Sequence, residues 1–127
     1  MPGKHLFEYA VIRIVPRVER EEFLNTGVIL YCKDLKYLDV LYSINKDRLN
    51  ALCGTLDCSE VEEHLQSFER ICKGDKEGGP IASLDLPSRF RWLTATRSTV
   101  VQASKVHPGL CTNPAETLRK LYQQLVL

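Results

Sequence analysis

The chain has 127 residues, of which 44% are hydrophobic and 26% charged. This length and composition predict a single globular domain over residues 1–127, large enough to bury a core without disulfide or metal staples. With 17 Lys and Arg against 16 Asp and Glu, the net charge of +1 excludes binding of a polyelectrolyte through bulk charge.

The first predicted strand covers residues 6–16. This segment is rich in β-branched residues and alternates apolar with other side chains through Val11. From Ile12 onward the alternation continues after a shift, and Pro16 is expected to end the strand. The pattern favours a strand over a helix.

Two further strands are predicted after a charged connection. Phe23–Cys32 is apolar, and Gly27 within it indicates a bulge or a close approach of another backbone segment. Residues 33–36 are typical of a turn, and Tyr37–Tyr42 alternates as a third strand. Short connections of this kind join antiparallel neighbours, so we expect a three-stranded meander.

Two helices are predicted next. Asn45 is a capping residue for a short helix through Leu52, which Gly54 ends. Ser59 and Glu62 have capping-box spacing at the start of a longer helix that ends at Lys73. Its apolar stripe consists of Val61, His64, Leu65, Phe68, Ile71 and Cys72.

The remainder of the chain carries weaker signals. Residues 74–80 hold three Gly, one Pro and three charged residues and are predicted to be a mobile linker-like loop. A single helical turn is predicted within residues 85–92, and a strand over residues 98–103. The His107-Pro108-Gly109 sequence is expected to break that strand.

A last helix completes the fold prediction. Asn113 caps it and Pro114 occupies its first position, where the missing N–H of proline costs nothing. Its buried stripe consists of Leu118, Leu121, Tyr122, Leu125 and Val126. Together these elements predict an α+β fold, in which an antiparallel sheet, made of the N-terminal meander plus a later strand, packs against a layer of about three helices.

The cysteines indicate neither a metal site nor a disulfide framework. They number five and include no CxxC pair. A zinc set drawn from Cys53, Cys58, His64 and Cys72 would place Cys58 and Cys72 about four turns apart on one helix. We expect each cysteine to be a small buried hydrophobe, and we expect no metal and no cofactor.

The chain also lacks a bilayer-length apolar run and a signal peptide, which predicts a cytoplasmic protein with no membrane partner.

Charge is distributed unevenly. Residues 86–115 contain four cations (Arg89, Arg91, Arg97 and Lys105) and no acid, whereas residues 1–85 hold 11 Lys and Arg against 15 Asp and Glu. Guanidinium groups interleaved with hydroxyls suit a phosphate or carboxylate ligand. The alternative is that these cations pair with the acidic first two thirds of the chain. Nucleic acid is not the expected anion, because the basic and aromatic residues are too few and the pI is about 7.6.

No catalytic signature is present. The sequence lacks GxxxxGK[ST], GxSxG, HExxH and paired-carboxylate patterns, so no catalytic residue is assigned. His107, flanked by Val106 and Pro108, is either a general acid or base or a structural histidine of a turn.

Two blocks of the chain resemble a known family. They are YAVIRIVP at residues 9–16 with EFLNTGVIL at residues 22–30, and RFRWLT at residues 89–94 through RSTVV to VHPGL at residues 106–110. In these blocks the chain resembles the bacterial domain of unknown function 3037 family. The resemblance implies a compact intracellular protein with an accessory role, partnered by a serine/threonine kinase of the HipA type encoded nearby. Its motif positions fall on Arg13, Asn25, Gly27, Arg91, Thr99, Ser104 and His107.

The sequence therefore favours a non-catalytic protein-interaction module, either as a monomer or as a homodimer. Buried Arg13 and Asn25 would either anchor the sheet around Gly27 or face a ligand. The alternative function is a small enzyme or binding protein for a phosphorylated or carboxylated ligand, with Arg91 and Arg97 as anion clamps. Its candidate ligand-binding residues are Arg13, Asn25, Arg91, Arg97, Thr99, Ser104 and His107. Convergence of the arginines and His107 in one pocket would favour this alternative.

Overall fold

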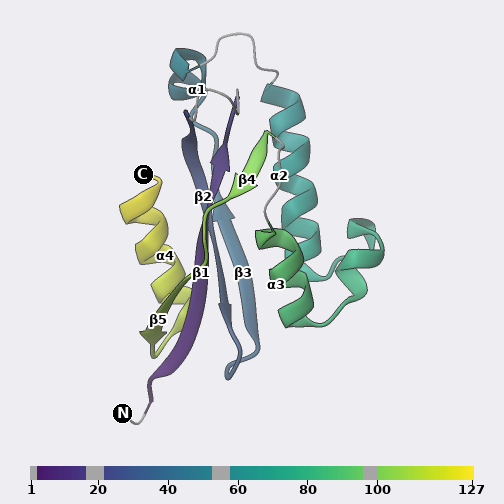
Figure 1. The fold of residues 1–127 in the computed structure, drawn as a ribbon, viewed down its shortest axis with the longest axis vertical. Helices are drawn as coiled ribbons and strands as arrows, with labels where there is room; N and C mark the ends of the chain where they lie inside the picture. Colours follow the sequence, from purple (N-terminus) through teal and green to yellow (C-terminus); the bar gives the residue numbers. More distant parts are fainter. Residues whose placement is uncertain (1–2, 17–21, 53–57, 96–99) are drawn as a thin grey trace.

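The computed structural model describes residues 3–16, 22–52, 58–95 and 100–127. The elements in chain order are β1 (His5–Ile14), β2 (Leu24–Cys32), β3 (Tyr37–Tyr42), α1 (Lys46–Leu52), α2 (Cys58–Lys73), the 3-10 turns η2 (Lys76–Gly78) and η3 (Pro80–Ser83), α3 (Leu86–Thr94), β4 (Val101–Ala103), β5 (His107–Cys111) and α4 (Pro114–Leu125). Within these residues the five strands form one antiparallel sheet in the order β3-β2-β1-β4 (Figure 1). Strand β5 pairs with the first half of β1, on the edge where β4 pairs with the second half.

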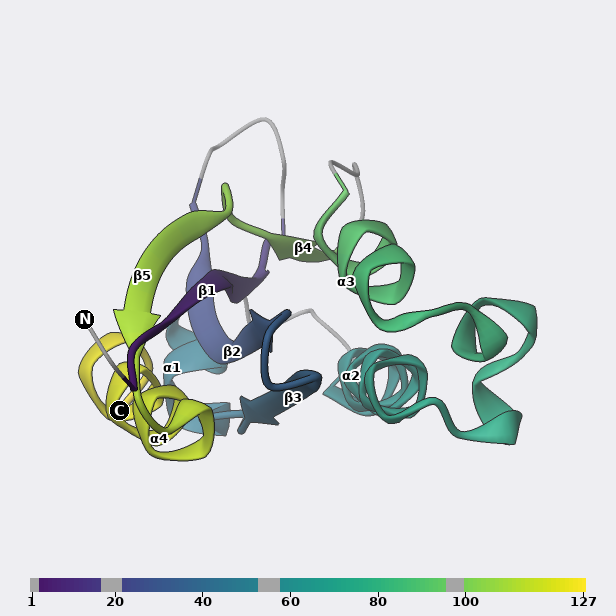
Figure 2. The same cartoon turned by 90° about the horizontal axis from the view of Figure 1, so that it is seen from below.

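The predicted α+β class and the N-terminal meander are confirmed, but the helices do not form a single layer. Helix α4 packs on one face of the sheet, and α2 and α3 pack on the other (Figure 2). Strand β1 is therefore buried on both faces, with Ala10, Val11 and Ile12 all in the core. The shift in its apolar alternation reflects this double burial, because a strand covered on both faces has a near-continuous apolar run.

At Gly27 the sequence predicts either a β-bulge or a close approach of another backbone segment, and the structure shows both. The pairing of β1 with β2 shifts between Ile12 and Arg13, so that Ile12 lies opposite Gly27 and Arg13 opposite Asn25. A Cβ on Gly27 would lie 2.6 Å from the carbonyl oxygen of Leu41 on β3. A bulge and a close backbone approach thus occur at the same place, and only glycine fits there.

The helices confirm most of the predicted caps and correct two details. The side chain of Asn45 accepts a hydrogen bond from the Arg48 amide at 3.1 Å and caps α1. Helix α2 begins at Cys58, so Ser59 lies inside its first turn and not at the cap; the residues before Cys58 lie outside the described ranges. His64 is exposed, because it lies at the margin of the stripe on the polar side, where water solvates its ring.

The segment predicted as a linker is instead folded into η2 and η3. Asp75 begins the first turn by accepting a hydrogen bond from the Glu77 amide at 3.0 Å. The following helix, α3, has nine residues where a single turn was predicted. Asp85 caps it by accepting from the Ser88 amide at 3.0 Å, and Pro87 favours its first turn.

The predicted break at His107-Pro108-Gly109 is wrong, because these residues form strand β5. The backbone N–H and C=O of Val11 both bond to Ser104, so the backbone groups of odd-numbered β1 residues point toward β4 and β5, and those of even-numbered residues point toward β2. Pro108 lies opposite Glu8, an even-numbered residue, so the backbone groups of this pair point away from each other. The N–H that Pro108 lacks would therefore point to the outer edge of the sheet. Gly109 lies opposite Phe7, whose ring fills the space that a Cβ would need.

The core consists of two clusters separated by the sheet. One lies between the sheet and α2 with α3, and the other between the sheet and α4. Cys32, Cys72 and Cys111 are buried within them as free thiols, as predicted, and burial raises the pKa of Cys72. Among the described residues no three His, Cys, Asp or Glu side chains are grouped closely enough to hold a metal ion. None of the described helices has the length and apolar character needed to cross a bilayer.

Candidate functional site

A cavity of about 560 Å³ lies between α3 and the ends of β1 and β2. Its apolar wall is formed by Leu6, Phe90 and Val106, and its polar groups include Glu8, Tyr31 and Arg91. Arg91 enters from α3, whereas Glu8 and Tyr31 lie opposite each other on β1 and β2. We call this space the Arg91 cavity. It brings together side chains from four segments of the chain that lie far apart in sequence.

The Arg91 cavity carries both signs of charge. Besides Arg91 it is lined by Lys33, Asp34 and Asp85. Asp85 is held by its cap: hydrogen bonds from the side chain and amide of Ser88 lower the pKa of its carboxyl. Asp34 lies 3.5 Å from Nδ1 of His5. This mixed lining differs from the acid-free site that the sequence of residues 86–115 predicts, because the acids come from β1, from the β2–β3 turn and from Asp85, the residue just before that segment.

Tyr31 is the phenol at the inner wall of the Arg91 cavity. Burial raises its pKa, and the carboxylate of Glu8 raises it further, whereas the guanidinium of Arg91 acts in the opposite direction. The ring packs against Phe90, with centroids 5.3 Å apart. Tyr31 is consequently a neutral, rigidly held hydroxyl at pH 7, able to donate a hydrogen bond to a bound group.

An exposed apolar surface adjoins this cavity. Leu6 and Leu110 lie directly opposite each other on β1 and β5, and 58% and 65% of their surfaces are exposed. Val106, 37% exposed, lines the cavity together with Leu6. Side chains of directly paired residues lie on the same face of a sheet. Leu6, Val106 and Leu110 therefore form one apolar rim at the mouth of the Arg91 cavity, which we call the apolar rim.

The predicted site residues that the structure describes do not come together. Arg91 lines the cavity, while Arg97 and Thr99 lie outside the described residues. His107 is exposed and its ring packs on Tyr9, with centroids 5.3 Å apart, next to the cluster beneath α4. Arg13 lies at the other end of β1, with its guanidinium carbon 4.1 Å from the ring centroid of Phe23. Sequence alone could not separate these positions, because it does not give the strand order.

Asn25 anchors the last turn of α4. Its side-chain amide donates to the carbonyl oxygen of Leu125 at 3.0 Å, which joins β2 to a helix 100 residues away in sequence. The last carbonyls of a helix lack partners within it, so this bond satisfies one of them. Of the two roles that the sequence leaves open for Asn25, this bond is an anchoring one, and it is made to α4 and not to the backbone around Gly27.

Ser104 lies between β4 and β5 and bonds to β1 where neither strand does. Its hydroxyl oxygen accepts a hydrogen bond from the Val11 amide at 2.8 Å and donates to the Lys105 carbonyl at 2.9 Å. Its own amide donates to the Val11 carbonyl at 2.8 Å. The side chain is buried and engaged in these bonds, which indicates a structural contribution.

We expect Ser104→Ala to lower the free energy of unfolding by about 1–2 kcal/mol, because the buried Val11 amide loses its acceptor. Urea unfolding measures the change. Ser83→Ala is the control, since Ser83 is exposed and its loss strands no amide, and we expect less than about 0.5 kcal/mol there. An unchanged midpoint in Ser104→Ala would contradict the structural role.

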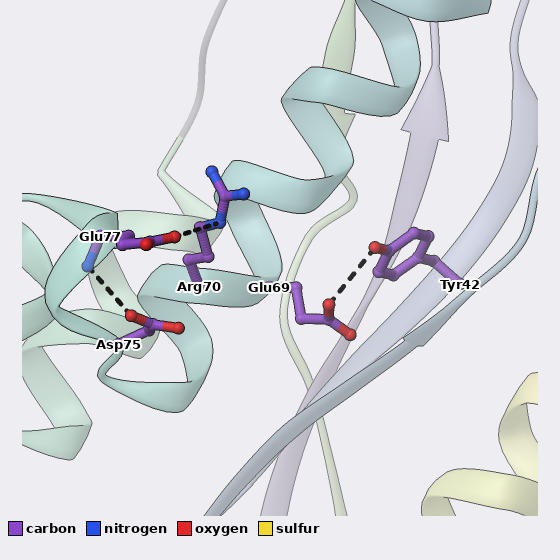
Figure 3. Close-up of polar contacts among 5 residues, drawn as sticks. All are labelled: Tyr42, Glu69, Arg70, Asp75 and Glu77. Carbon is purple, nitrogen blue, oxygen red and sulfur yellow. Dashed lines mark hydrogen bonds and ion pairs between the residues drawn. The ribbon is translucent and has the colours of Figure 1, made fainter.

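Among the described residues, no salt bridge joins Arg89, Arg91 or Lys105 to the acidic part of the chain, and Arg97 lies outside the described ranges. The ion pairs of the described acidic part are made with other cations, such as Arg70 with Glu77 at 3.8 Å. Figure 3 shows this pair beside the Asp75 cap, and also the contact of Tyr42 with Glu69 at 3.5 Å. Arg89 instead donates to the carbonyl of Ile71 at 3.5 Å, near the end of α2. Exposed ion pairs such as that of Arg70 with Glu77 contribute little to stability.

The residues that sequence reasoning missed are Glu8, Tyr31 and the apolar rim. Leu110 offered one sign of the apolar rim, because it is an apolar residue in a segment interpreted as a turn. The sequence could not show that Leu110 pairs with Leu6. Glu8 likewise looks like an ordinary polar strand residue. Only the register of β1 with β2 and β5 places these side chains at one cavity.

Comparison with known proteins gives a family and no closer relative. The family model described as "Protein of unknown function (DUF3037)" matches residues 9–126, nearly the whole chain. Neither the curated proteins nor the solved structures give a significant match. The match begins within β1 and ends beyond α4, so it covers most of the sheet and the helices on both faces, whereas Leu6 and Glu8 of the Arg91 cavity lie before it. The chain accordingly belongs to the DUF3037 family, whose function is not defined.

Proposed function

We propose that this chain is a non-catalytic protein-interaction module that binds its partner at the Arg91 cavity and its apolar rim. The observation that carries the proposal is the exposed Leu6–Leu110 pair beside the cavity. Helices cover much of the sheet on both faces, whereas this pair of leucines lies open to solvent. Contiguous exposed apolar side chains rimmed by polar groups are typical of protein-binding surfaces.

The lining of the cavity favours a peptide segment over a small anion. Glu8, Asp34 and Asp85 would repel a phosphate or carboxylate, and they outnumber Arg91 and Lys33. An apolar side chain of the partner would fit against Phe90 and Leu6, and its flanking polar groups would find both donors and acceptors. Such a segment buries the apolar rim without leaving the acids of the cavity unpartnered.

The first partner to test is the kinase that the family resemblance implies, a serine/threonine kinase of the HipA type. A second copy of this chain is the other occupant that the same surface could accept, since a two-fold axis would bring two apolar rims together. The two occupants differ in stoichiometry, and light scattering on purified samples distinguishes them.

The test is the affinity of purified chain for the purified kinase, with two variants matched in chemistry. Leu110→Arg places a charge on the apolar rim, and Leu127→Arg places the same charge at the distant C-terminal end, where Leu127 is 69% exposed. We expect wild type and Leu127→Arg to bind alike and Leu110→Arg to bind at least tenfold more weakly, because a charge would be buried against apolar groups.

Both leucines are exposed, so neither substitution is expected to change the melting temperature much. Equal binding by all three proteins would contradict the docking surface. Absence of a complex with wild type would reject this kinase. Concentration-dependent dimerisation of wild type that Leu110→Arg abolishes would assign the surface to a second copy of the chain.

A further inference from the structure

A second cavity, of about 530 Å³, lies at the opposite end of the sheet, where α4 ends and α1 begins (Figure 1). Its apolar walls come from Leu24 on β2, from Ile44 before α1, and from Val126 after α4. Its polar groups come from Asn25, Lys46 and Arg48. We call it the Arg48 cavity. It shares no lining residue with the Arg91 cavity.

The side chains that line the Arg48 cavity, which also include that of Leu127, carry a net positive charge. Among its described lining residues are the cations Lys46 and Arg48, the amides of Asn25 and Asn45, and the hydroxyl of Ser43, but no acidic side chain. The Arg91 cavity, by contrast, contains three carboxylates. Of the two, the Arg48 cavity therefore has the electrostatics that a phosphate or carboxylate group requires.

The two cations are only weakly engaged by the protein. Neither Lys46 nor Arg48 forms a salt bridge with another described residue. The guanidinium of Arg48 reaches the carbonyl of Val126 at 3.5 Å, the outer limit for a hydrogen bond. The cap of Asn45 fixes the backbone of the first turn of α1, from which the side chain of Arg48 extends to the cavity.

Asn25 forms a fixed part of the wall. Its amide nitrogen is held by Leu125, which fixes the orientation of the side chain. Its carboxamide oxygen is buried and accepts no hydrogen bond from a described protein group. Because that oxygen has almost no accessible surface, it is not a contact for a bound molecule, and Asn25 shapes the cavity without holding the anion.

We propose that the Arg48 cavity binds a small organic anion that carries an apolar portion, with its phosphate or carboxylate group held by Lys46 and Arg48. The apolar portion packs against Leu24, Ile44 and Val126, so the organic anion binds more tightly than inorganic phosphate. This site is separate from the protein-docking surface, and each proposal can fail without the other.

The experiment is a titration of the ¹⁵N-labelled chain, followed by NMR, with four probes. Phenyl phosphate and benzoate combine a ring with an anion, inorganic phosphate is the anion alone, and benzyl alcohol is the ring alone. We expect phenyl phosphate or benzoate, or both, to give saturable shifts at the amides of Asn25, Lys46 and Arg48. Inorganic phosphate should shift the same amides with lower affinity, and benzyl alcohol should bind more weakly still.

Paired variants localise the charge that the anion needs. Lys46→Gln/Arg48→Gln removes two cations from the Arg48 cavity, and Lys33→Gln/Arg91→Gln removes two from the Arg91 cavity. We expect the dissociation constant to rise at least tenfold in the first variant and to stay unchanged in the second, because each charged hydrogen bond contributes about a factor of ten. Added salt should weaken binding to wild type.

Three results would overturn the proposal. The first is the absence of saturable shifts with every anionic probe, and the second is equal affinity of wild type and Lys46→Gln/Arg48→Gln. The third is binding of benzyl alcohol as tight as that of phenyl phosphate and benzoate, since the cavity would then recognise only the ring. Binding of one of the two anionic probes alone supports the site and identifies its head group.

Discussion

Gly27→Ala is expected to lower the free energy of unfolding by about 3 kcal/mol, which is a large share of the total free energy of unfolding of a domain of this size. The added methyl group would lie 2.6 Å from the carbonyl oxygen of Leu41 and 2.8 Å from Cβ of Tyr42. Both neighbours belong to β3, so they can yield only by moving the strand away from β2. Chemical unfolding followed by circular dichroism measures the change.

Gly79→Ala is the control for this substitution. Gly79 has a positive φ of 82° but nothing within 4 Å of the position that its Cβ would take. Its φ of 82° and ψ of −165° lie in a region essentially confined to glycine, so its replacement tests the cost of backbone conformation alone, about 1–3 kcal/mol. A loss below about 1 kcal/mol in Gly27→Ala would show that β2 and β3 separate more easily than their packing indicates.

Gly109→Ala is expected to cost about 2–3 kcal/mol through a different contact. Here the added methyl group meets the far end of the Phe7 ring, at 2.4 Å from Cζ. The ring is buried in the cluster beneath α4, so it can yield only by disturbing that packing. Strand β5 would have to leave β1, or the ring would have to leave the core.

A double substitution separates a clash from a general weakening of β5. In Phe7→Leu the ring is absent, so adding Gly109→Ala to that variant should cost less than about 1 kcal/mol. The two substitutions are then strongly non-additive, as expected for residues in contact. Equal costs of Gly109→Ala with and without the ring would mean that the alanine disturbs β5 by itself, independently of Phe7.

Much of the fold could be predicted because its signals are local. The alternation of Tyr37–Tyr42, the cap at Asn45 and the apolar stripe of α2 each depend on neighbours along the chain. Strand β5 could not be predicted, because Pro108 and Gly109 favour turns in isolation. They fit a strand only at an edge, with a phenylalanine ring opposite the glycine.

The candidate sites depend on information of another kind. Arg91 could be singled out by its charge, but the acids around it come from segments as distant as Glu8. Asn25 could be recognised as a polar residue in an apolar strand, yet its partner Leu125 depends on how α4 crosses the sheet. Lys46 and Arg48 look like ordinary residues of a short helix. Each of these sites is a product of strand order and helix placement, which a linear pattern does not contain.

Strands β3 and β5, at the edges of the sheet, influence whether copies of the chain can pair edge to edge at high concentration. Pro108 offers no N–H on the edge formed by β5, and on β3 the outward amide of Val40 is occupied by the Asp39 carboxylate at 2.8 Å. Each of these edges therefore lacks one of the donors that an added strand would use. Self-templated stacking into fibrils needs a continuous row of such donors, and in the native state that row is interrupted at these two positions.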